Sequence, residues 1–245
     1  MCKIAHWNGK ELTHAAHELY TWSKCDHPGV LKVLGFAVSD DSILLVSPWM
    51  QSGSLTRYLE RNCVYDRLQL CIDLATTVAY LHEKGIVHGD IKTDNIVVSD
   101  DGGILLVDFG SAALVNYFTL RFTRTSPHLS WSVRFAAPEI VLEVITTHTA
   151  KSDVYSLGMT ILQILTGEPP YADKSDMGVI ILLAKAVKKT PLPRSMAGGL
   201  LRNQYADSKL WELLLGCWDH DPNLRPTAME VKQTLVDIKR MSNHV

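Results

Sequence analysis

The sequence lacks the features that mark several large classes of protein. Its five cysteines are spread along the chain without paired Cys-x-x-Cys spacing, so neither a disulfide framework nor a zinc site is predicted. A formal charge of −2 gives no excess of one sign for capturing nucleic acid or an anionic membrane. Residues 1–10 have no apolar signal-peptide core, and the longest nearly apolar run, residues 177–187, is too short to span a bilayer. We expect no nucleic-acid partner, no membrane span, and a cytoplasmic or nuclear location.

Length and composition predict one large folded domain. With 245 residues, 47% of them hydrophobic, the chain can bury a sizeable core. Strand and helix patterns alternate up to about residue 50, and the pattern is mostly helical afterwards. The expected fold class is α+β, with a single domain over residues 1–245. Its two lobes are a small mixed lobe, residues 1–50, and a larger helical lobe, residues 51–245.

Local patterns predict the elements of these lobes. The small lobe shows an amphipathic helix ending near Trp22 and strands over Val30–Leu34 and Ile43–Val46. In the helical lobe, apolar periodicity or polar caps mark four helices, over residues 68–84, 153–165, 208–218 and 227–240. The second of these is apolar nearly all round, which predicts that it is buried inside the domain. Ser208 and Thr227 are the predicted caps of the last two helices.

One polar stretch, residues 88–95, leads into a predicted hairpin of two apolar strands, and Asp108 follows that hairpin. Phosphoryl transfer from Mg-ATP needs a carboxylate to orient a hydroxyl, an amide and a second carboxylate for the metal, and a cation on the transferred phosphate. Asp90, Asn95, Asp108 and Lys92 supply these four groups. The stretch therefore predicts metal-assisted phosphate chemistry.

In order and spacing these motifs resemble those of the protein kinases, from Lys3 to about Val236. Residues 88–95 are similar to the family's catalytic loop, residues 108–110 to its metal-binding triplet, and residues 137–139 to the end of its activation segment. Residues 153–158 resemble its central buried helix, and residues 217–227 its closing helices. The resemblance implies a two-lobed kinase fold with the active site between the lobes.

The resemblance also implies roles for single residues. Asp90 would be the catalytic base and Lys92 the cation on the γ-phosphoryl group, while Asn95 and Asp108 would hold Mg²⁺. Lys3, fifteen residues before Glu18, would bind the α- and β-phosphates and pair with that glutamate. The remaining residues implied to line the ATP pocket are Ser47, Trp49, Met50 and Val97.

Three structural features follow from the same resemblance. The side chains implied to stack as an apolar spine between the lobes are Trp22, Val33, His88 and Phe109. Glu139 and Arg225 would form a buried ion pair. Ser132 would place a hydroxyl beside Asp90 and Lys92, within the long segment from Ser111 to Phe135 whose weak periodicity predicts a functional loop.

The chain departs from the family pattern at two places. The family's glycine-rich loop lies on two strands before the lysine, whereas this chain starts two residues before Lys3. We therefore expect a truncated form or fragment that lacks this loop, with weaker nucleotide affinity and poorer phosphate alignment. At Gly89 many kinases carry an arginine that pairs with an activation-loop phosphate, so regulation by that route is disfavoured.

Several of these residues also have a plain structural interpretation. A lysine near a terminus, such as Lys3, is usually a solvated charge, and Glu18 alone would be a polar-face residue of its helix. His88 is interpreted as a hydrogen-bonded core histidine. Thr93 and Asp94 match no chemical role and are interpreted as polar loop residues.

The function predicted from this set is that of a protein serine/threonine kinase in intracellular signalling, with ATP and Mg²⁺ as cofactors and a protein as substrate. Lys92 favours the serine/threonine type, whereas Gly53–Leu55 and Cys217–Trp218 are similar to the tyrosine-kinase-like group. Two alternatives stay open. The missing loop and Gly89 suit a pseudokinase-like scaffold. A His-Gly-Asp triplet also occurs in antibiotic and choline phosphotransferases, although residues 137–139 argue for protein substrates.

Overall fold

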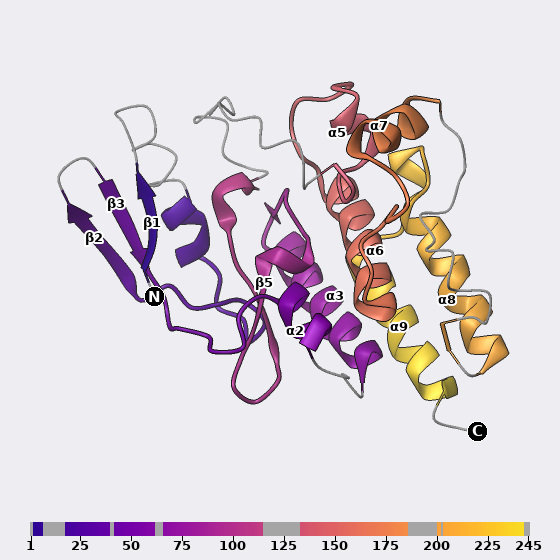
Figure 1. Cartoon of the computed structure of the whole chain (residues 1–245), viewed down its shortest axis with the longest axis horizontal. Coiled ribbons are helices and arrows are strands. Elements are labelled where there is room, and N and C mark those ends of the chain that lie inside the picture. Colours follow the sequence, from indigo (N-terminus) through magenta and orange to yellow (C-terminus); the bar gives the residue numbers. More distant parts are fainter. Residues whose placement is uncertain are drawn as a thin grey trace.

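The computed structural model describes residues 2–6, 18–39, 42–61, 66–114, 133–185, 200–201 and 203–242, and for residues 2–6, 38–39, 42–44 and 113–114 it describes the backbone alone. A small antiparallel sheet lies at one end of the molecule and a helical body at the other (Figure 1). This arrangement confirms the expected α+β, two-lobed fold. The boundary near residue 50 stays a prediction.

The small sheet contains the strands β1 (Cys2–His6), β3 (Ser42–Val46) and β2 (Gly35–Ser39), in that spatial order. The structure confirms the predicted strand over Ile43–Val46, but the predicted strand over Val30–Leu34 is wrong. Val30 forms a single parallel bridge with Leu106, and the Leu31 N–H donates to the Leu106 carbonyl at 3.1 Å. This segment is apolar because it crosses from the sheet to the helical body, and Val30 and Leu31 are buried there.

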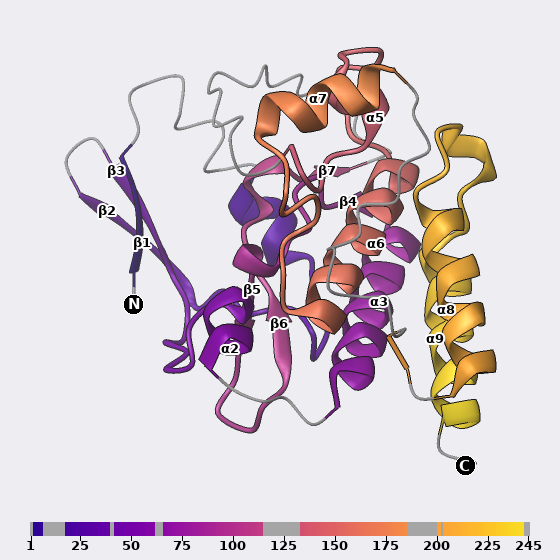
Figure 2. The same cartoon turned by 45° about the vertical axis from the view of Figure 1, so that its right-hand side comes forward.

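The helical body is organised around α6 (Ala150–Thr166), which is buried on nearly every side, as its composition predicted. The other helices that the structure describes in full here are α2 (Leu55–Arg61), α3 (Arg67–Glu83), α5 (Pro138–Val141), α7 (Asp176–Ala184), α8 (Gln204–Cys217) and α9 (Ala228–Ser242). Helices α3, α6, α8 and α9 lie side by side (Figure 2). Between β1 and β2, residues 18–23 form one further helical stretch.

The helix ends follow from local polar contacts, with one correction. Thr227 and Glu230 form the predicted capping box, in which the Glu230 N–H donates to Thr227 Oγ1 at 3.2 Å. Ser208, however, is not a cap. It lies inside α8, and Asn203 caps the helix instead by accepting the N–H groups of Tyr205 and Ala206 at 3.0 and 3.1 Å. An asparagine side chain satisfies two end amides here, so the helix begins one turn earlier than predicted.

A hairpin of β5 (Ile96–Val98) and β6 (Ile104–Leu106) lies between the sheet and the helices and confirms the predicted pair of apolar strands. Beside it, β4 (Ile86–Val87) pairs with β7 (Ala113–Leu114), a pairing that the sequence did not predict. Two-residue strands are too short to produce a periodic pattern. Three short 3₁₀ turns complete the described elements, namely η1 (Thr93–Asn95), η2 (Phe109–Ser111) and η3 (Pro222–Leu224).

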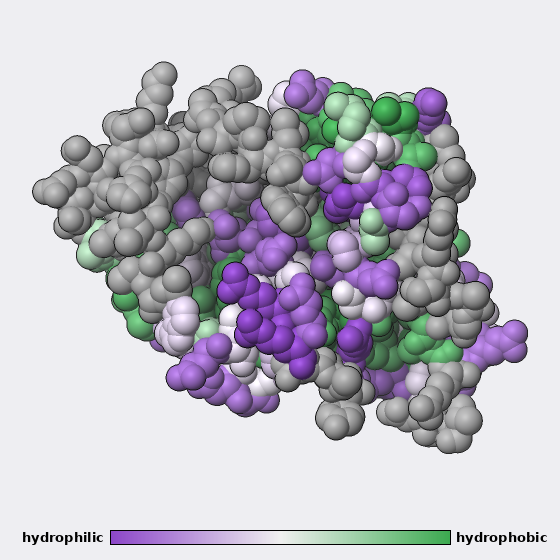
Figure 3. All heavy atoms as spheres, viewed as in Figure 1, coloured by the Kyte–Doolittle hydropathy of each residue, from purple (hydrophilic) through white to green (hydrophobic). Residues whose placement is uncertain are grey.

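Apolar side chains reach the surface in a few places. Figure 3 shows apolar atoms over α5 and α7, where Met177 and Ile181 are exposed. Within the described ranges, no helix combines the length and the apolar character needed to cross a membrane.

Candidate active site

Two polar side chains of the loop of residues 88–95 converge on the carboxylate of a third, Asp90. Lys92 Nζ lies 2.7 Å from Asp90 Oδ2, and Asn95 Nδ2 donates at 2.9 Å to both Asp90 Oδ2 and the Asp90 carbonyl. The Asp90 and Lys92 side chains keep 22% and 14% of their surface exposed, so the group can be reached by a substrate. Both donors contact the same carboxylate oxygen, Oδ2, and together they fix the orientation of the carboxylate.

Asp153 of α6 binds the backbone at the start of this loop. Its two carboxylate oxygens accept the backbone N–H groups of His88 and Gly89, both at 2.8 Å, and His82 Nε2 lies 3.0 Å from Oδ2. Complete burial alone would raise the pKa of Asp153, but the hydrogen bond and charge of His82, with smaller contributions from His88 and the Gly89 amide, bring the pKa below its ordinary value. Asp153 is therefore an ionised anchor inside the domain.

The His88 side chain links the loop to Val107, at the base of the hairpin. The Asp90 N–H donates to Nδ1 at 3.3 Å, so Nδ1 is an acceptor and Nε2 carries the hydrogen that faces the Val107 carbonyl at 3.1 Å. The ring is fully buried, which confirms its interpretation as a hydrogen-bonded core histidine.

The geometry at position 89 accepts only glycine. Gly89 has a φ of +79°, and a Cβ atom there would lie 2.8 Å from the Ser111 carbonyl oxygen and 3.1 Å from the His148 ring. Both the backbone conformation and the lack of space exclude a larger side chain. The departure from the arginine of many kinases is therefore built into the surrounding structure.

Polar side chains along α6 follow the loop in register. After Asp153 come Thr160, whose Oγ1 donates to the Ile91 carbonyl at 3.2 Å, and Gln163, whose Oε1 accepts from Thr93 Oγ1 at 2.6 Å. Along the loop, residues 88–89, 91 and 93 meet Asp153, Thr160 and Gln163 in the same order. Helix α6 is thus a template that fixes successive residues of the loop.

The turn of residues 108–110 is held mainly by packing. Phe109 is fully buried between Trp22, with ring centroids 5.9 Å apart, and His88, at 5.1 Å. These contacts form most of the apolar spine implied by the sequence, and Val33 lies half-buried against the same core. Asp108 has a left-handed backbone (φ +68°), which turns its carboxylate toward the Gly110 amide at 3.4 Å.

The hairpin brings the two implied magnesium ligands to its base, where the Val107 N–H donates to the Asn95 carbonyl at 2.9 Å. Asn95 uses its amide nitrogen on Asp90, which leaves the amide oxygen as the atom that would face a metal. One carboxylate and one amide oxygen suit Mg²⁺, which takes its remaining ligands from water and phosphate. Among the residues the structure describes, no cluster of three His, Cys, Asp or Glu side chains forms a competing metal site.

Glu18 and Lys3 differ in how far the structure describes them. The Glu18 side chain is buried, and its Oε2 lies 3.4 Å from the point where a Cβ of Gly110 would stand, so it reaches the turn of residues 108–110. Lys3 lies in β1, opposite Leu45 of β3. Its side chain is outside the described set, and its pairing with Glu18 stays a prediction.

The segment after β3 holds the other residues implied to bind the nucleotide. Ser47 and Met50 are half-buried, whereas Trp49 is 56% exposed. The segment is tied to the hairpin by an antiparallel bridge between Ser54 and Val97, and Val97 itself is half-buried. The structure thus ties the end of this segment, at Ser54, to the strand that follows the loop of residues 88–95, and the nucleotide-binding roles of Ser47, Trp49 and Met50 stay predictions.

On the far side of the helical body, Glu139 and Arg225 form the expected buried ion pair. Two parallel hydrogen bonds of 2.7 and 2.8 Å join the carboxylate to the guanidinium, and Arg225 is 1% exposed. The guanidinium also donates to the carbonyls of Asp219 and Lys151. Ser132, implied to lie beside Asp90, is outside the described residues.

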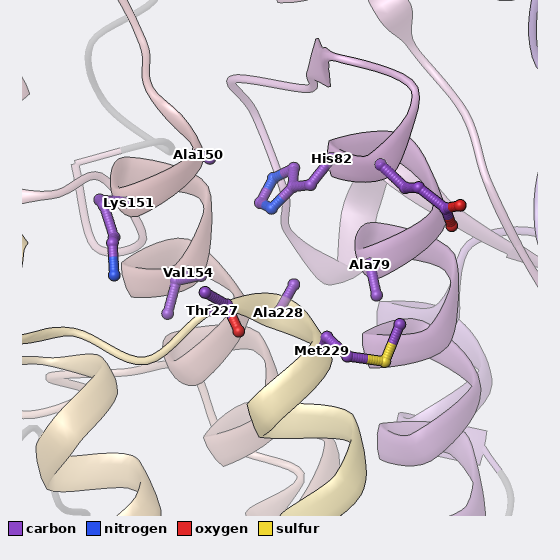
Figure 4. A pocket seen from close by; sticks show the side chains of 9 residues that line it. Ala79, His82, Ala150, Lys151, Val154, Thr227, Ala228 and Met229 are labelled. Carbon is purple, nitrogen blue, oxygen red and sulfur yellow. The ribbon is translucent and has the colours of Figure 1, made fainter.

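A surface hollow of about 370 Å³ lies between α3, α6 and α9, away from Asp90 (Figure 4). Small and apolar side chains leave this space, and the residues that line it are Ala79, His82, Glu83, Ala150, Lys151, Val154, Thr227, Ala228 and Met229. The His82 ring projects from α3 toward the start of α6. His82, in the wall of the hollow, contacts Asp153 through its Nε2 atom. Asp153 in turn binds the loop backbone at His88 and Gly89.

Neither Thr160 nor Gln163 was singled out from the sequence, which indicated Thr93 only as a polar loop residue and Asp153 only as part of a buried helix. A signal for them was present. Asp153, Thr160 and Gln163 are polar residues in an apolar helix, at spacings of seven and three that place them on one face. Polar groups in so buried a helix need partners, which here are the loop atoms.

Comparison with known proteins agrees with this geometry. Residues 2–236 match the family model described as a protein kinase domain. Serine/threonine-protein kinase STY17 of Arabidopsis thaliana is 25% identical over 237 residues, which are 95% of this chain and 39% of that protein. Mitogen-activated protein kinase kinase kinase ANP1 of the same plant is 28% identical over 236 residues, 93% of this chain and 33% of that protein. MAP kinase kinase kinase wis4 of Schizosaccharomyces pombe is 28% identical over 224 residues, 88% and 15% respectively. This chain spans at most 39% of the length of these three relatives.

Proposed function

The chain belongs to the protein kinase family, and from this membership we propose that it transfers the γ-phosphoryl group of ATP to a hydroxyl group of a protein substrate. The observation that carries the proposal is the convergence of Lys92 and Asn95 on the Asp90 carboxylate. A carboxylate fixed in this way can orient an incoming hydroxyl and accept its proton, while the neighbouring ammonium faces the transferred group.

Each residue of the site has a part in the proposed reaction. Asp90 orients the hydroxyl, and Lys92 neutralises charge that develops on the γ-phosphoryl oxygens. Asn95 and Asp108 would hold Mg²⁺, which when bound neutralises the phosphates and aligns them. His88 and Asp153 are positioning residues, because they act through the loop backbone and not on the substrate.

The substrate class is proposed from two sources. Lys92 follows Asp90 by two residues, as in serine/threonine kinases, and the relatives named above are a serine/threonine-protein kinase and two mitogen-activated protein (MAP) kinase kinase kinases. We therefore assign serine and threonine side chains of a cytoplasmic or nuclear protein as acceptors, in intracellular signalling. The tyrosine-kinase-like group is proposed from Gly53–Leu55 and Cys217–Trp218 alone.

The test is a pair of measurements on the purified chain. Mg-ATP binding is measured by calorimetry with Asp108→Ala as the control, and phosphate transfer to a generic protein substrate with Asp90→Asn as the control. We expect binding that Asp108→Ala weakens and transfer that Asp90→Asn abolishes. Transfer that Asp90→Asn leaves unchanged would contradict the proposed roles. Nucleotide binding without any transfer would favour the pseudokinase-like scaffold.

A further inference from the structure

A chain of side-chain contacts runs beneath the catalytic loop from α6 to α2. Thr93 Oγ1 donates to Gln163 Oε1 at 2.6 Å and lies 2.7 Å from Thr56 Oγ1. Thr56 Oγ1 in turn donates to Asp94 Oδ1 at 2.9 Å. The contacts therefore join three separate elements, α6, η1 and α2. The reaction proposed above assigns no chemical role to any of these four residues.

The inner half of this series of contacts, between Thr93 and Gln163, is shielded from solvent. Thr93 has no exposed surface and Gln163 is 6% exposed, whereas Thr56 is half-buried and Asp94 is exposed. Hydrogen bonds away from water are stronger, and a buried amide that loses its partner stays unsatisfied. The Thr93–Gln163 contact is therefore a fixed point, and the Thr56 contact extends it to the surface.

The position of this fixed point matters for the proposed reaction. Thr93 lies directly after Lys92 and opens the 3₁₀ turn that ends at Asn95. Asp153 fixes the loop before Asp90. Among the hydrogen bonds of the described residues, the Ile91 carbonyl contact with Thr160 and the Thr93 contact with Gln163 tie residues 91–93 to α6. Loss of the Thr93 contact would loosen the backbone that carries Lys92 and the start of the turn that leads to Asn95.

We propose that Thr93 and Gln163 are positioning residues for phosphoryl transfer, which hold Lys92 and Asn95 at the correct distance from Asp90, and that Thr56 couples this anchor to α2. The inference rests on the proposed kinase function. It predicts that loss of the Thr93 hydroxyl slows the chemical step more than it weakens substrate binding, because reacting groups displaced by about 1 Å can cost roughly 100-fold in rate.

The experiment compares Thr93→Val, which keeps the shape and removes the hydroxyl, with Thr93→Ser, which keeps the hydroxyl. Thr77→Val is the matched control, because Thr77 is also a buried threonine but its hydroxyl donates within its own helix, to the Asp73 carbonyl at 2.9 Å. For each protein, kcat and KM for ATP and for a peptide substrate, the melting temperature, and hydrogen exchange of residues 92–95 are measured without nucleotide and with Mg-ATP.

We expect Thr93→Val to lower kcat by about 10- to 100-fold, to change both KM values less than threefold, and to speed exchange of residues 92–95. Thr93→Ser should restore kcat to within threefold. Thr77→Val should lower the melting temperature without lowering kcat. A Thr93→Val protein that folds and keeps its kcat within threefold of wild type overturns the inference.

The same experiment separates this inference from the proposed function. If wild type shows no phosphate transfer, the proposed function fails, and hydrogen exchange then decides the anchoring alone. Faster exchange of residues 92–95 in Thr93→Val, and not in Thr77→Val, supports the anchor. Equal exchange in the two variants refutes it. Gln163→Met, which removes the partner amide, should repeat the Thr93→Val effect without adding to it in the double variant.

Discussion

The catalytic loop of residues 88–95 and the turn of residues 108–110 meet at one site but are held in different ways. Buried hydrogen bonds from Asp153, Thr160 and Gln163 tie the loop to α6. The turn depends on Phe109, which stacks on Trp22 of the helical stretch beside the sheet. The loop therefore belongs to the helical body, whereas the turn is shared between the lobes. A movement of Trp22 would displace Asp108 and leave Asp90 in place.

The strongest test of the loop is Asp90→Asn. The substitution keeps the shape of the side chain but removes the base, so phosphate transfer should fall by about 10²- to 10⁴-fold. The melting temperature should stay near that of wild type, because the amide oxygen can still accept from Lys92. A calorimetric melt and a transfer assay on the same preparation check both statements. A large fall in melting temperature would mean that Asp90 is structural.

The corresponding test of the turn is Phe109→Ala, which should destabilise the protein by about 3–5 kcal/mol because it leaves a cavity between Trp22 and His88. Denaturant unfolding measures this loss. Hydrogen exchange should rise more in residues 18–23 than in residues 88–93, because Asp153, Thr160 and Gln163 still hold the loop beside His88. Phe109→Leu, which fills part of the space, is the control and should cost less. Equal loss of protection in the loop would remove the contrast between the two regions.

Asp153→Asn tests the polar anchor and should cost about 2–4 kcal/mol, since an amide can accept from only one of the two buried N–H groups. The cost should depend on pH. The pKa of Asp153 is lower in the folded state than the ordinary value of about 3.9, so the carboxylate contributes fully above that value. The contribution is lost as pH falls through the folded pKa, and the His82 partner faces the same carboxylate. Denaturant melts should show the difference in unfolding free energy between the two proteins narrowing as the pH falls below about 4.

The smallest effect is expected for Gly89→Ala, which combines a left-handed backbone with a close contact to Ser111 and should cost about 2–3 kcal/mol. Gly102→Ala is the matched control. Gly102 has a similar φ of +86°, but its Cβ would meet no atom within 4 Å, so only the backbone cost of about 1 kcal/mol remains. The difference between the two variants in thermal unfolding measures the steric part. Equal costs would show that position 89 tolerates a side chain.

The regular part of the fold was predictable because its signals are local. The hairpin, the burial of α6 and the Thr227–Glu230 capping box all follow from residues close together in the sequence. Errors arose where a distant partner decided the structure. Val30–Leu34 is apolar because of its contact with Leu106, which lies more than seventy residues away, and no local pattern distinguishes this from a strand.

For the candidate site, the loop residues were predictable and their supports were not. Asp90, Lys92 and Asn95 lie within six residues, so their motif is visible directly. The partner of Thr93 is Gln163, and its contact depends on how α6 packs against the loop. A polar residue in an apolar helix indicates that a hydrogen-bond partner is needed, but the sequence pattern does not identify that partner.

The contacts between α6 and the catalytic loop also have a consequence for synthesis of the chain. A ribosome makes Thr93 about seventy residues before Gln163, which at 5–20 residues per second is a delay of roughly 4–14 s. During this interval the loop lacks α6 and the partners that α6 provides for its inward-facing polar groups, among them Gln163 for Thr93. The residues proposed for catalysis therefore cannot reach their final geometry until the ribosome has also synthesised α6.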